Sequence, residues 1–191
     1  MCSSDLANNI ADSLVLWAFG SHEAYAAYAN NWLKIHGFSQ TTVGTDASGL
    51  SETSTSTARD LVGIGTLAHQ NPVIAKIASL ESANIPVAGT VKNVNWLLGV
   101  DGITGLKTGN SDAAGGAFVF SANVTLSGSR TITLIGAVMQ APNLSAALTS
   151  SRALVQSATP LPSKASGRSS FTSSPPRKLH FDDATLSMLL R

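Results

Sequence analysis

The 191-residue sequence contains 43% hydrophobic and 12% charged residues, which is enough apolar material for a domain with a core and excludes a mainly disordered chain. Its formal net charge is only +1, without the basic stripe typical of nucleic-acid-binding proteins, so no nucleic-acid partner is expected. The single cysteine, Cys2, excludes an internal disulfide, and no run approaches the roughly 18 apolar residues of a membrane span.

Two helices are predicted near the start of the chain. The first runs from Asn8 to Phe19 as a buried helix and stops at Gly20. The second begins after the capping residue Ser21 and continues to about His36. The apolar residues at helical spacing, which we expect to be buried, are Ile10, Leu14, Trp17 and Ala18 in the first helix and Tyr25, Tyr28 and Trp32 in the second.

The middle of the chain is predicted to hold a polar loop, two further helices and an extended segment. Residues 41–54 are polar and contain two glycines, so they indicate an ordered loop. Ser56 or Thr55 is expected to cap a helix over residues 58–69, and Asn71 caps a short helix through residue 78 with proline in its first turn. Residues 85–95 are typical of a strand and a turn.

The next part of the chain is predicted to form a small antiparallel sheet followed by a helix. Strands are expected over residues 104–109, 116–124 and 131–139, with a turn at 127–129 between the last two. Asn143 or Ser145 begins a helix that ends near Ser157. Helices, then a sheet, then a helix indicate an α+β fold.

Lys107-Thr108-Gly109 lies in the first of these strands and supplies the candidate ligand-binding groups of the chain. The lysine supplies a cation, the threonine a hydroxyl group, and the glycine a bare strand against which a ligand can lie. A ligand that carries a carboxylate next to an acyl group would suit this cation, hydroxyl group and bare strand. The tripeptide is short, and a simple turn at a strand end is the alternative interpretation.

The order of several motifs resembles the serine-type D-alanyl-D-alanine carboxypeptidases, the low-molecular-mass penicillin-binding proteins of peptidase family S11. The resemblance covers about residues 7–150 and implies the fold shared by penicillin-binding proteins and β-lactamases. The motifs that carry it are Ala7-Asn8-Asn9-Ile10-Ala11, Tyr28-Ala29-Asn30, Gly37-Phe38, Asp46-Ala47-Ser48-Gly49-Leu50, Ser56-Thr57-Ala58-Arg59-Asp60-Leu61, Asn95-Trp96-Leu97-Leu98, Gly102, Lys107-Thr108-Gly109 and Asp112-Ala113-Ala114-Gly115.

Two of the three catalytic motifs of that family are incomplete in this sequence. The family uses a Ser-x-x-Lys for the nucleophile and its base, followed by Ser-x-Asn and Lys-Thr/Ser-Gly. None of the lysines here has a serine three positions before it, and Leu6-Ala7-Asn8 stands in place of Ser-x-Asn. We therefore expect an N-terminally truncated catalytic domain that is inactive by itself, with an exposed apolar face and poor solubility. Asn8 and Asn9 could instead cap a helix.

The resemblance implies a role for each remaining site residue. Lys107 would hold the terminal carboxylate of the substrate, and Thr108 would donate a hydrogen bond to the same group. Gly109 would let the substrate pair with the strand, and the N–H of Asn110 would be one donor of the oxyanion hole. Asn8 would contact the substrate amide.

The resemblance also implies the partners and the domain limits. The expected substrate is a peptidoglycan stem peptide that ends in D-Ala-D-Ala, with β-lactams as further ligands of the intact enzyme and with no metal or cofactor. Residues 1–6 are expected to be a non-native leader, residues 7–158 the partial catalytic domain, and residues 159–191 a flexible or out-of-frame tail.

Localisation and rival functions follow from the same comparison. Relatives act at the extracytoplasmic face of the cell envelope, and this chain shows no signal peptide. A non-catalytic module that binds peptidoglycan peptides or β-lactams is the main alternative function. A β-lactamase is a third candidate function, because these enzymes also use a Lys-Thr-Gly motif. Residues 46–50 and 56–61 match the carboxypeptidases instead.

Overall fold

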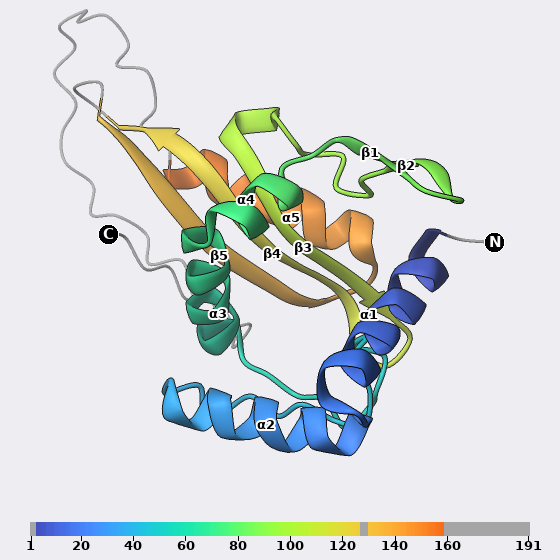
Figure 1. Ribbon diagram of the computed structural model, residues 1–191. Coiled ribbons are helices and arrows are strands. Elements are labelled where there is room, and N and C mark those ends of the chain that lie inside the picture. The colour runs from blue at the N-terminus through green and yellow to red at the C-terminus, as the bar shows by residue number, and fades with distance from the viewer. Residues whose placement is uncertain (1–2, 127–129, 159–191) are drawn as a thin grey trace, which may run out of the picture.

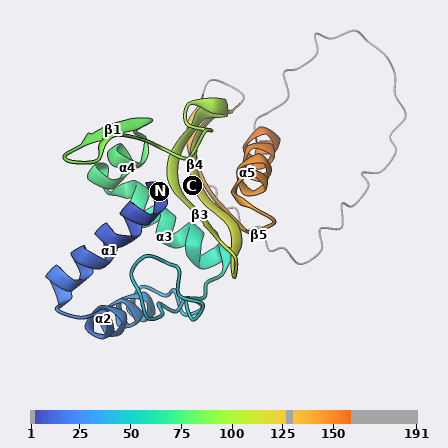
Figure 2. The same ribbon diagram turned by 90° about the vertical axis from the view of Figure 1, so that its right-hand side faces the viewer.

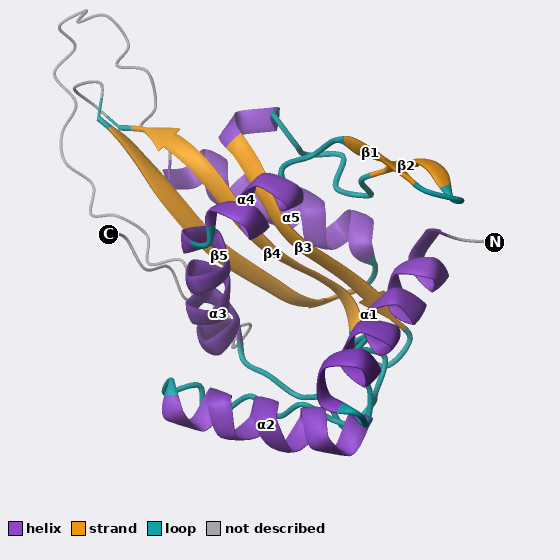
Figure 3. Cartoon of the chain, in the orientation of Figure 1, coloured by secondary structure: helices purple, strands orange, loops and turns teal. Residues whose placement is uncertain are grey.

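A computed structural model describes residues 3–126 and 130–158 of the chain. The predicted α+β class is confirmed (Figures 1 and 3). The helices are α1 (Ser3–Phe19), α2 (His22–Ile35), α3 (Ala58–Gln70), α4 (Pro72–Ala78) and α5 (Leu144–Ala158), with a short 3-10 turn, η1, at Val100–Gly102. The strands are β1 (Ser82–Ile85), β2 (Gly89–Lys92), β3 (Ile103–Ser111), β4 (Gly115–Thr125) and β5 (Thr131–Ala141). No described helix is both long and apolar enough to cross a bilayer.

The core is built on an antiparallel sheet in the order β3–β4–β5. Helix α5 covers one face of this sheet and α3 the other, as Figure 2 shows. Alternation of side chains along β4 directs one set toward α5, where Phe118 and Phe120 are fully buried, and the other toward α3, where Val119 packs beside Val62 and Ile135. The two-stranded hairpin β1–β2 lies apart from this sheet.

A hydrogen bond between the residue after β4 and the residue before β5 fixes which backbone groups point out of the sheet. The N–H of Leu126 donates to the carbonyl of Arg130 at 2.8 Å, so these two residues form a hydrogen-bonded pair. Such pairs alternate with non-hydrogen-bonded pairs along an antiparallel ladder. In the observed register, the residues of β5 whose N–H and C=O therefore point away from β4 are Thr131, Thr133, Ile135 and Ala137.

Side-chain contacts agree with this assignment. Side chains lie closest in non-hydrogen-bonded pairs. The hydroxyl groups of Thr125 and Thr131 are 3.3 Å apart, and Thr133 Oγ1 donates to Asn123 Oδ1 at 3.2 Å. Both contacts join residues that the register places opposite each other in such pairs.

Helix α1 ends at the predicted residue, Phe19, but it begins five residues earlier than predicted, at Ser3, and the expectation that it is buried is wrong. Ile10, Leu14 and Trp17 are 57%, 59% and 84% exposed, and Ala18 is exposed as well. Among the residues of α1 from Asn8 onward, Val15 is the buried one. The physical reason is that α1 packs mainly against α2, and neither the sheet nor another described helix covers its apolar stripe. The separate expectation of an exposed apolar face is thereby confirmed, whereas poor solubility stays a prediction.

Helix α2 is confirmed in its position and in its cap. Ser21 accepts a hydrogen bond from the N–H of Ala24 at 3.1 Å, and the helix ends at Ile35. The predicted burial is wrong for Tyr28, which is 58% exposed, because the side of α2 that packs inward is centred on the buried Leu33. Tyr25 and Trp32 are half-buried.

Helix α3 also forms as predicted, but its cap is Thr57 rather than Ser56 or Thr55. Thr57 accepts the N–H of Asp60 at 3.2 Å, while the buried carboxylate of Asp60 accepts the N–H of Gln40 at 3.0 Å and the hydroxyl of Thr41 at 2.9 Å. These bonds to the preceding loop fix where the first turn begins, which local propensity alone does not determine.

The remaining elements follow the sequence closely, with one correction. The strand and turn expected over residues 85–95 form the β1–β2 hairpin, which begins earlier, at Ser82. The short helix α4, with its Asn71 cap, the strands of the sheet and helix α5 are confirmed. The predicted turn at 127–129 and the predicted tail at 159–191 lie outside the described residues.

Candidate functional site

Lys107, Thr108, Gly109 and Asn110 lie consecutively on β3, an edge strand of the sheet. Strand β4 pairs with one side of β3, and no described strand pairs with the other. Helix α1 and the β1–β2 hairpin lie on the β3 side of the sheet in both orientations (Figures 1 and 2). The candidate site is therefore the outer edge of β3.

The outer edge of β3 presents the backbone of Thr108 and Asn110. Because Phe118 and Phe120 use their backbone groups toward β5, the alternate residues Val119 and Ala117 bond toward β3. Val119 lies opposite Lys107 and Ala117 opposite Gly109, so the N–H and C=O of the residues between them, Thr108 and Asn110, face outward. An extended peptide could add to this edge as a further strand.

Side chains of these residues point to opposite faces of the sheet. Lys107 lies opposite Val119 and shares the α3 face, whereas Thr108 lies opposite Phe118 and shares the α5 face. Asn110 is on the α5 face too, where its Oδ1 accepts the N–H of Leu144 at 3.0 Å. The amide side chain of Asn110 thus anchors the first residue of α5, a role that sequence reasoning missed because no local pattern brings residues 110 and 144 together.

Lys107 is a cation without an anionic partner among the described residues. Its side chain is exposed and its Nζ donates to the carbonyl of Thr108, while neighbouring protein atoms displace part of the water around the ammonium group. This desolvation lowers the pKa of Lys107 below its ordinary value. Among the described residues, the ion pairs involve Asp12 and Asp101 and leave Lys107 free to meet an incoming carboxylate.

We expect the pKa of Lys107 to be lower in the folded chain than in the urea-unfolded chain. Between these two pKa values the unfolded state binds more protons, so the free energy of unfolding rises as pH rises through that window. Heteronuclear NMR titration of the lysine side chain in both states measures the difference. Lys107→Gln is the control, since it should remove this part of the pH dependence. A folded pKa equal to or above the unfolded one would contradict the assignment.

Gly109 is a glycine that the protein itself does not require. A Cβ built on it would meet only Ala117 Cβ, at 3.9 Å, which is ordinary van der Waals contact, and its φ angle is not in the left-handed region. The half-buried hydroxyl of Thr108 makes no hydrogen bond within the described part of the chain. A bare strand and an unused hydroxyl group are both available to a ligand.

Asn8 lies on a different element from the other predicted site residues. It is half-buried within α1, and no hydrogen bond between described residues joins it to β3. Because α1 begins at Ser3, Asn8 and Asn9 are inside the helix, so the alternative that they cap it is wrong. A substrate-contacting role for Asn8 stays a prediction.

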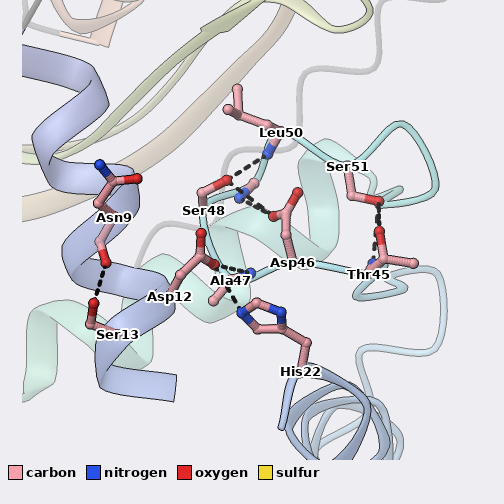
Figure 4. A network of polar contacts seen from close by, with 11 residues as sticks. Asn9, Asp12, Ser13, His22, Thr45, Asp46, Ala47, Ser48, Leu50 and Ser51 are labelled. Carbon is pink, nitrogen blue, oxygen red and sulfur yellow. Dashed lines mark hydrogen bonds and ion pairs between the residues drawn. The ribbon is translucent and has the colours of Figure 1, made fainter. Parts of the chain in front are cut away.

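The Asp46–Leu50 motif holds α1 against the rest of the chain (Figure 4). Asp46 Oδ1 accepts the hydroxyl of Ser48 at 3.2 Å and the N–H of Gly49 at 2.8 Å, which closes the loop. The N–H of Ala47 then donates to Asp12 Oδ1 on α1 at 3.2 Å. His22 Nε2 is 3.3 Å from the same oxygen, at ion-pair distance but without hydrogen-bond geometry. The loop therefore positions α1.

A metal site would need several suitable side chains close together in the described part of the chain. No three histidine, cysteine, aspartate or glutamate side chains there are grouped so that they could hold a metal ion. The functional groups that the structure does bring together are the cation of Lys107, the hydroxyl of Thr108 and the outward backbone of β3.

Comparison with known proteins identifies the relatives of this arrangement. Residues 3–143 match the family model described as D-alanyl-D-alanine carboxypeptidase. No curated protein sequence matches the chain.

Solved structures with the same fold include penicillin-binding protein D2 from Listeria monocytogenes in its cefotaxime-bound form, with 28% identity, a TM-score of 0.64, and 78% of this chain and 60% of that chain covered. The D-alanyl-D-alanine carboxypeptidase from Mycobacterium tuberculosis H37Rv shows 32% identity and a TM-score of 0.59, with 71% and 53% covered. A point mutant of the Streptomyces K15 DD-transpeptidase shows 25% identity and a TM-score of 0.59, with 71% and 54% covered. The chain thus spans between half and two thirds of the length of these relatives.

Proposed function

The chain belongs to the D-alanyl-D-alanine carboxypeptidase family, and we propose that its β3 edge binds the D-Ala-D-Ala end of a peptidoglycan stem peptide in a serine-type carboxypeptidase. The observation that carries this proposal is the unpaired cation of Lys107 beside the outward backbone of Thr108 and Asn110. A peptide that ends in a free carboxylate can meet both, since its backbone pairs with the strand while its terminus reaches the ammonium group.

Each residue has a defined part in the proposed reaction. In this enzyme class, a serine attacks the carbonyl between the two D-alanines, forms an acyl-serine and releases the terminal D-alanine, after which water hydrolyses the ester. Lys107 and Thr108 hold the terminal carboxylate, and the N–H of Asn110 donates to the oxygen that becomes negatively charged. Asn8, on α1, is proposed to contact the substrate amide.

This polypeptide is proposed to be inert alone, because its 191 residues contain no Ser-x-x-Lys. Removal of the serine from an unrelated Ser-His-Asp hydrolase lowers turnover by on the order of a million-fold, and here the lysine base is absent as well. The Listeria relative has been solved with cefotaxime and with ampicillin bound, which supports β-lactams as ligands of an intact enzyme that contains this strand. Action at the extracytoplasmic face of the cell envelope is part of the same proposal.

A hybrid protein tests the proposal. Residues 105–111 of this chain replace the matching strand of the Listeria protein, and a fluorescent penicillin is added to the hybrid and, in parallel, to the 191-residue polypeptide. We expect covalent labelling of the hybrid and none of the polypeptide, because the hybrid alone combines this strand with a nucleophilic serine. A folded hybrid that is not labelled, or a labelled polypeptide, would overturn the proposal.

The second candidate is a non-catalytic module that binds peptidoglycan peptides or β-lactams. It is favoured by the absence of Ser-x-x-Lys together with the retained Lys107 and Thr108. Titration of the 191-residue polypeptide with a D-Ala-D-Ala peptide separates the two candidates. The carboxypeptidase proposal predicts that the peptide has no measurable affinity for the polypeptide, since β3 is only one wall of a cleft. The binding module instead requires saturable binding of the peptide, and Lys107→Ala should abolish that binding.

A further inference from the structure

One side of helix α1 faces the rest of the chain, and Asn8 lies on that side. From residue 8 onward, the buried or half-buried residues of α1 recur mainly at spacings of three and four, which places them on one face of a helix with about 3.6 residues per turn. The exposed apolar residues Ile10, Leu14 and Trp17 fall on the opposite face. The inward residues are Asn8, Ala11, Asp12, Val15 and Phe19.

Asp12 joins this inward face to two other elements. Its Oδ1 accepts the N–H of Ala47 at 3.2 Å, from the loop 46–50, and lies 3.3 Å from His22 Nε2 on α2 (Figure 4). The His22 nitrogen is buried and has no hydrogen-bond partner among the described residues. Within residues 8–19, Asp12 is the residue whose hydrogen bond and ion-pair contact reach beyond α1. The polar attachment of this part of α1 therefore depends on one carboxylate.

Apolar contacts alone do not account for the way α1 is turned. The helix packs mainly against α2, and its last turn is attached by the ring of Phe19, whose centroid lies 5.4 Å from that of Tyr25 and 5.2 Å from that of Tyr28. The larger apolar residues are on the exposed face, so burial of apolar surface would favour the opposite side. Hydrophobic attraction has no preferred direction, whereas a hydrogen bond requires a defined geometry. The bond to Asp12 specifies the observed rotation.

We propose that Asp12 is a positioning residue of the candidate site, because its bond to the Ala47 N–H sets the rotation of α1 about its own axis and thereby directs Asn8 inward. This inference rests on the proposed contact between Asn8 and the substrate amide. Asn8 precedes Asp12 by four residues, about one turn, so the two side chains lie one above the other on the same face. A rotation of α1 that withdraws Asp12 from Ala47 also turns Asn8 away from the inward face.

The distance between two spin labels in the full 191-residue chain tests the proposal. The labels are attached to Asn9→Cys on α1 and Asp112→Cys in the turn after β3, both exposed positions, and Cys2→Ser removes the native thiol. We expect one narrow distance distribution in this parent and a broader or shifted one with Asp12→Ala, which keeps the helix but removes the acceptor. Asp12→Asn retains an oxygen acceptor and should restore the narrow distribution. A broad distribution in the parent, or equal distributions with Asp12→Ala and Asp12→Asn, would overturn the proposal.

Hydrogen exchange of the Ala47 amide measures the bond itself, without labels, and we expect it to be about tenfold or more faster in Asp12→Ala than in the unmodified chain. Ser13→Ala is the matched control, because the exposed Ser13 donates its hydrogen bond only to the carbonyl of Asn9 within α1, and it should leave the rate at Ala47 unchanged. Unchanged protection of the Phe120 amide shows that the sheet stays folded. An equal rate at Ala47 in Asp12→Ala and the unmodified chain would overturn the proposal. Neither measurement uses a ligand, so failure of the penicillin or peptide experiments is distinguishable from failure of this inference.

Discussion

Replacing Lys107 by alanine in the hybrid protein is expected to slow penicillin acylation by about 100-fold. The side chain of Lys107 is exposed, has no carboxylate partner among the described residues, and stands on the strand against which the ligand lies. A hydrogen bond to a charged group contributes about 1.5–3 kcal/mol, and removal of about 2.7 kcal/mol of transition-state stabilisation corresponds to the stated factor. The second-order rate constant of labelling by a fluorescent penicillin measures the change.

Two controls show whether the loss comes from the contact with the ligand carboxylate. A penicillin methyl ester lacks the carboxylate, so the ratio of its rates with the parent hybrid and the Lys107→Ala hybrid should be close to one. Ser111→Ala changes a residue of the same grafted strand that has no assigned contact with the ligand, so acylation should be nearly unchanged. An equal effect of Lys107→Ala on the penicillin and on its ester would show that the lysine acts on the fold instead of on the carboxylate.

The sheet and its motif could be predicted from the sequence because their signals are local. β-Branched and aromatic residues predict the strands β4 and β5. The Lys-Thr-Gly tripeptide lies in the preceding strand, at the distance from the other motifs that the family resemblance implies. Helical periodicity likewise located α1. Periodicity identifies which side of a helix is apolar, but it cannot tell whether another element covers that side, and the exposure of Trp17 on α1 shows the difference.

The parts of the candidate site that could not be predicted depend on contacts between distant residues. The outward direction of the Asn110 N–H follows from the register of the whole sheet, which the hydrogen bond between Leu126 and Arg130 fixes. The anchoring of α5 by Asn110 joins residues from separate elements. Helix α3 is capped by Thr57 instead of the predicted Ser56 or Thr55, because the loop before the helix holds Asp60. In each case tertiary contacts decide among options that local sequence leaves open.

Gly102→Ala is expected to lower the free energy of unfolding by about 3–4 kcal/mol, a large effect for one methyl group. Gly102 has a φ of +81°, in the left-handed region, and a Cβ built there would lie 2.2 Å from the carbonyl oxygen of Asn123. That oxygen belongs to β4, so relief of the clash requires a shift of the strand backbone at the start of β3. Urea unfolding of the parent and the variant measures the difference, with an unchanged m-value as the sign that the compactness of both states is preserved.

Gly49→Ala separates the two causes of this effect. Gly49 has a similar φ of +85°, but a Cβ there would meet nothing within 4 Å, so its substitution reports the left-handed strain alone, about 1–2 kcal/mol. The additional loss in Gly102→Ala is then the cost of moving β4 away from the beginning of β3. Because the same close approach sets the start of the strand that carries Lys107, a hybrid whose grafted strand is extended to include Gly102→Ala should also be acylated more slowly. Equal destabilisation by the two substitutions would show that the backbone at Gly102 relaxes freely and that its contact with β4 does not position the site.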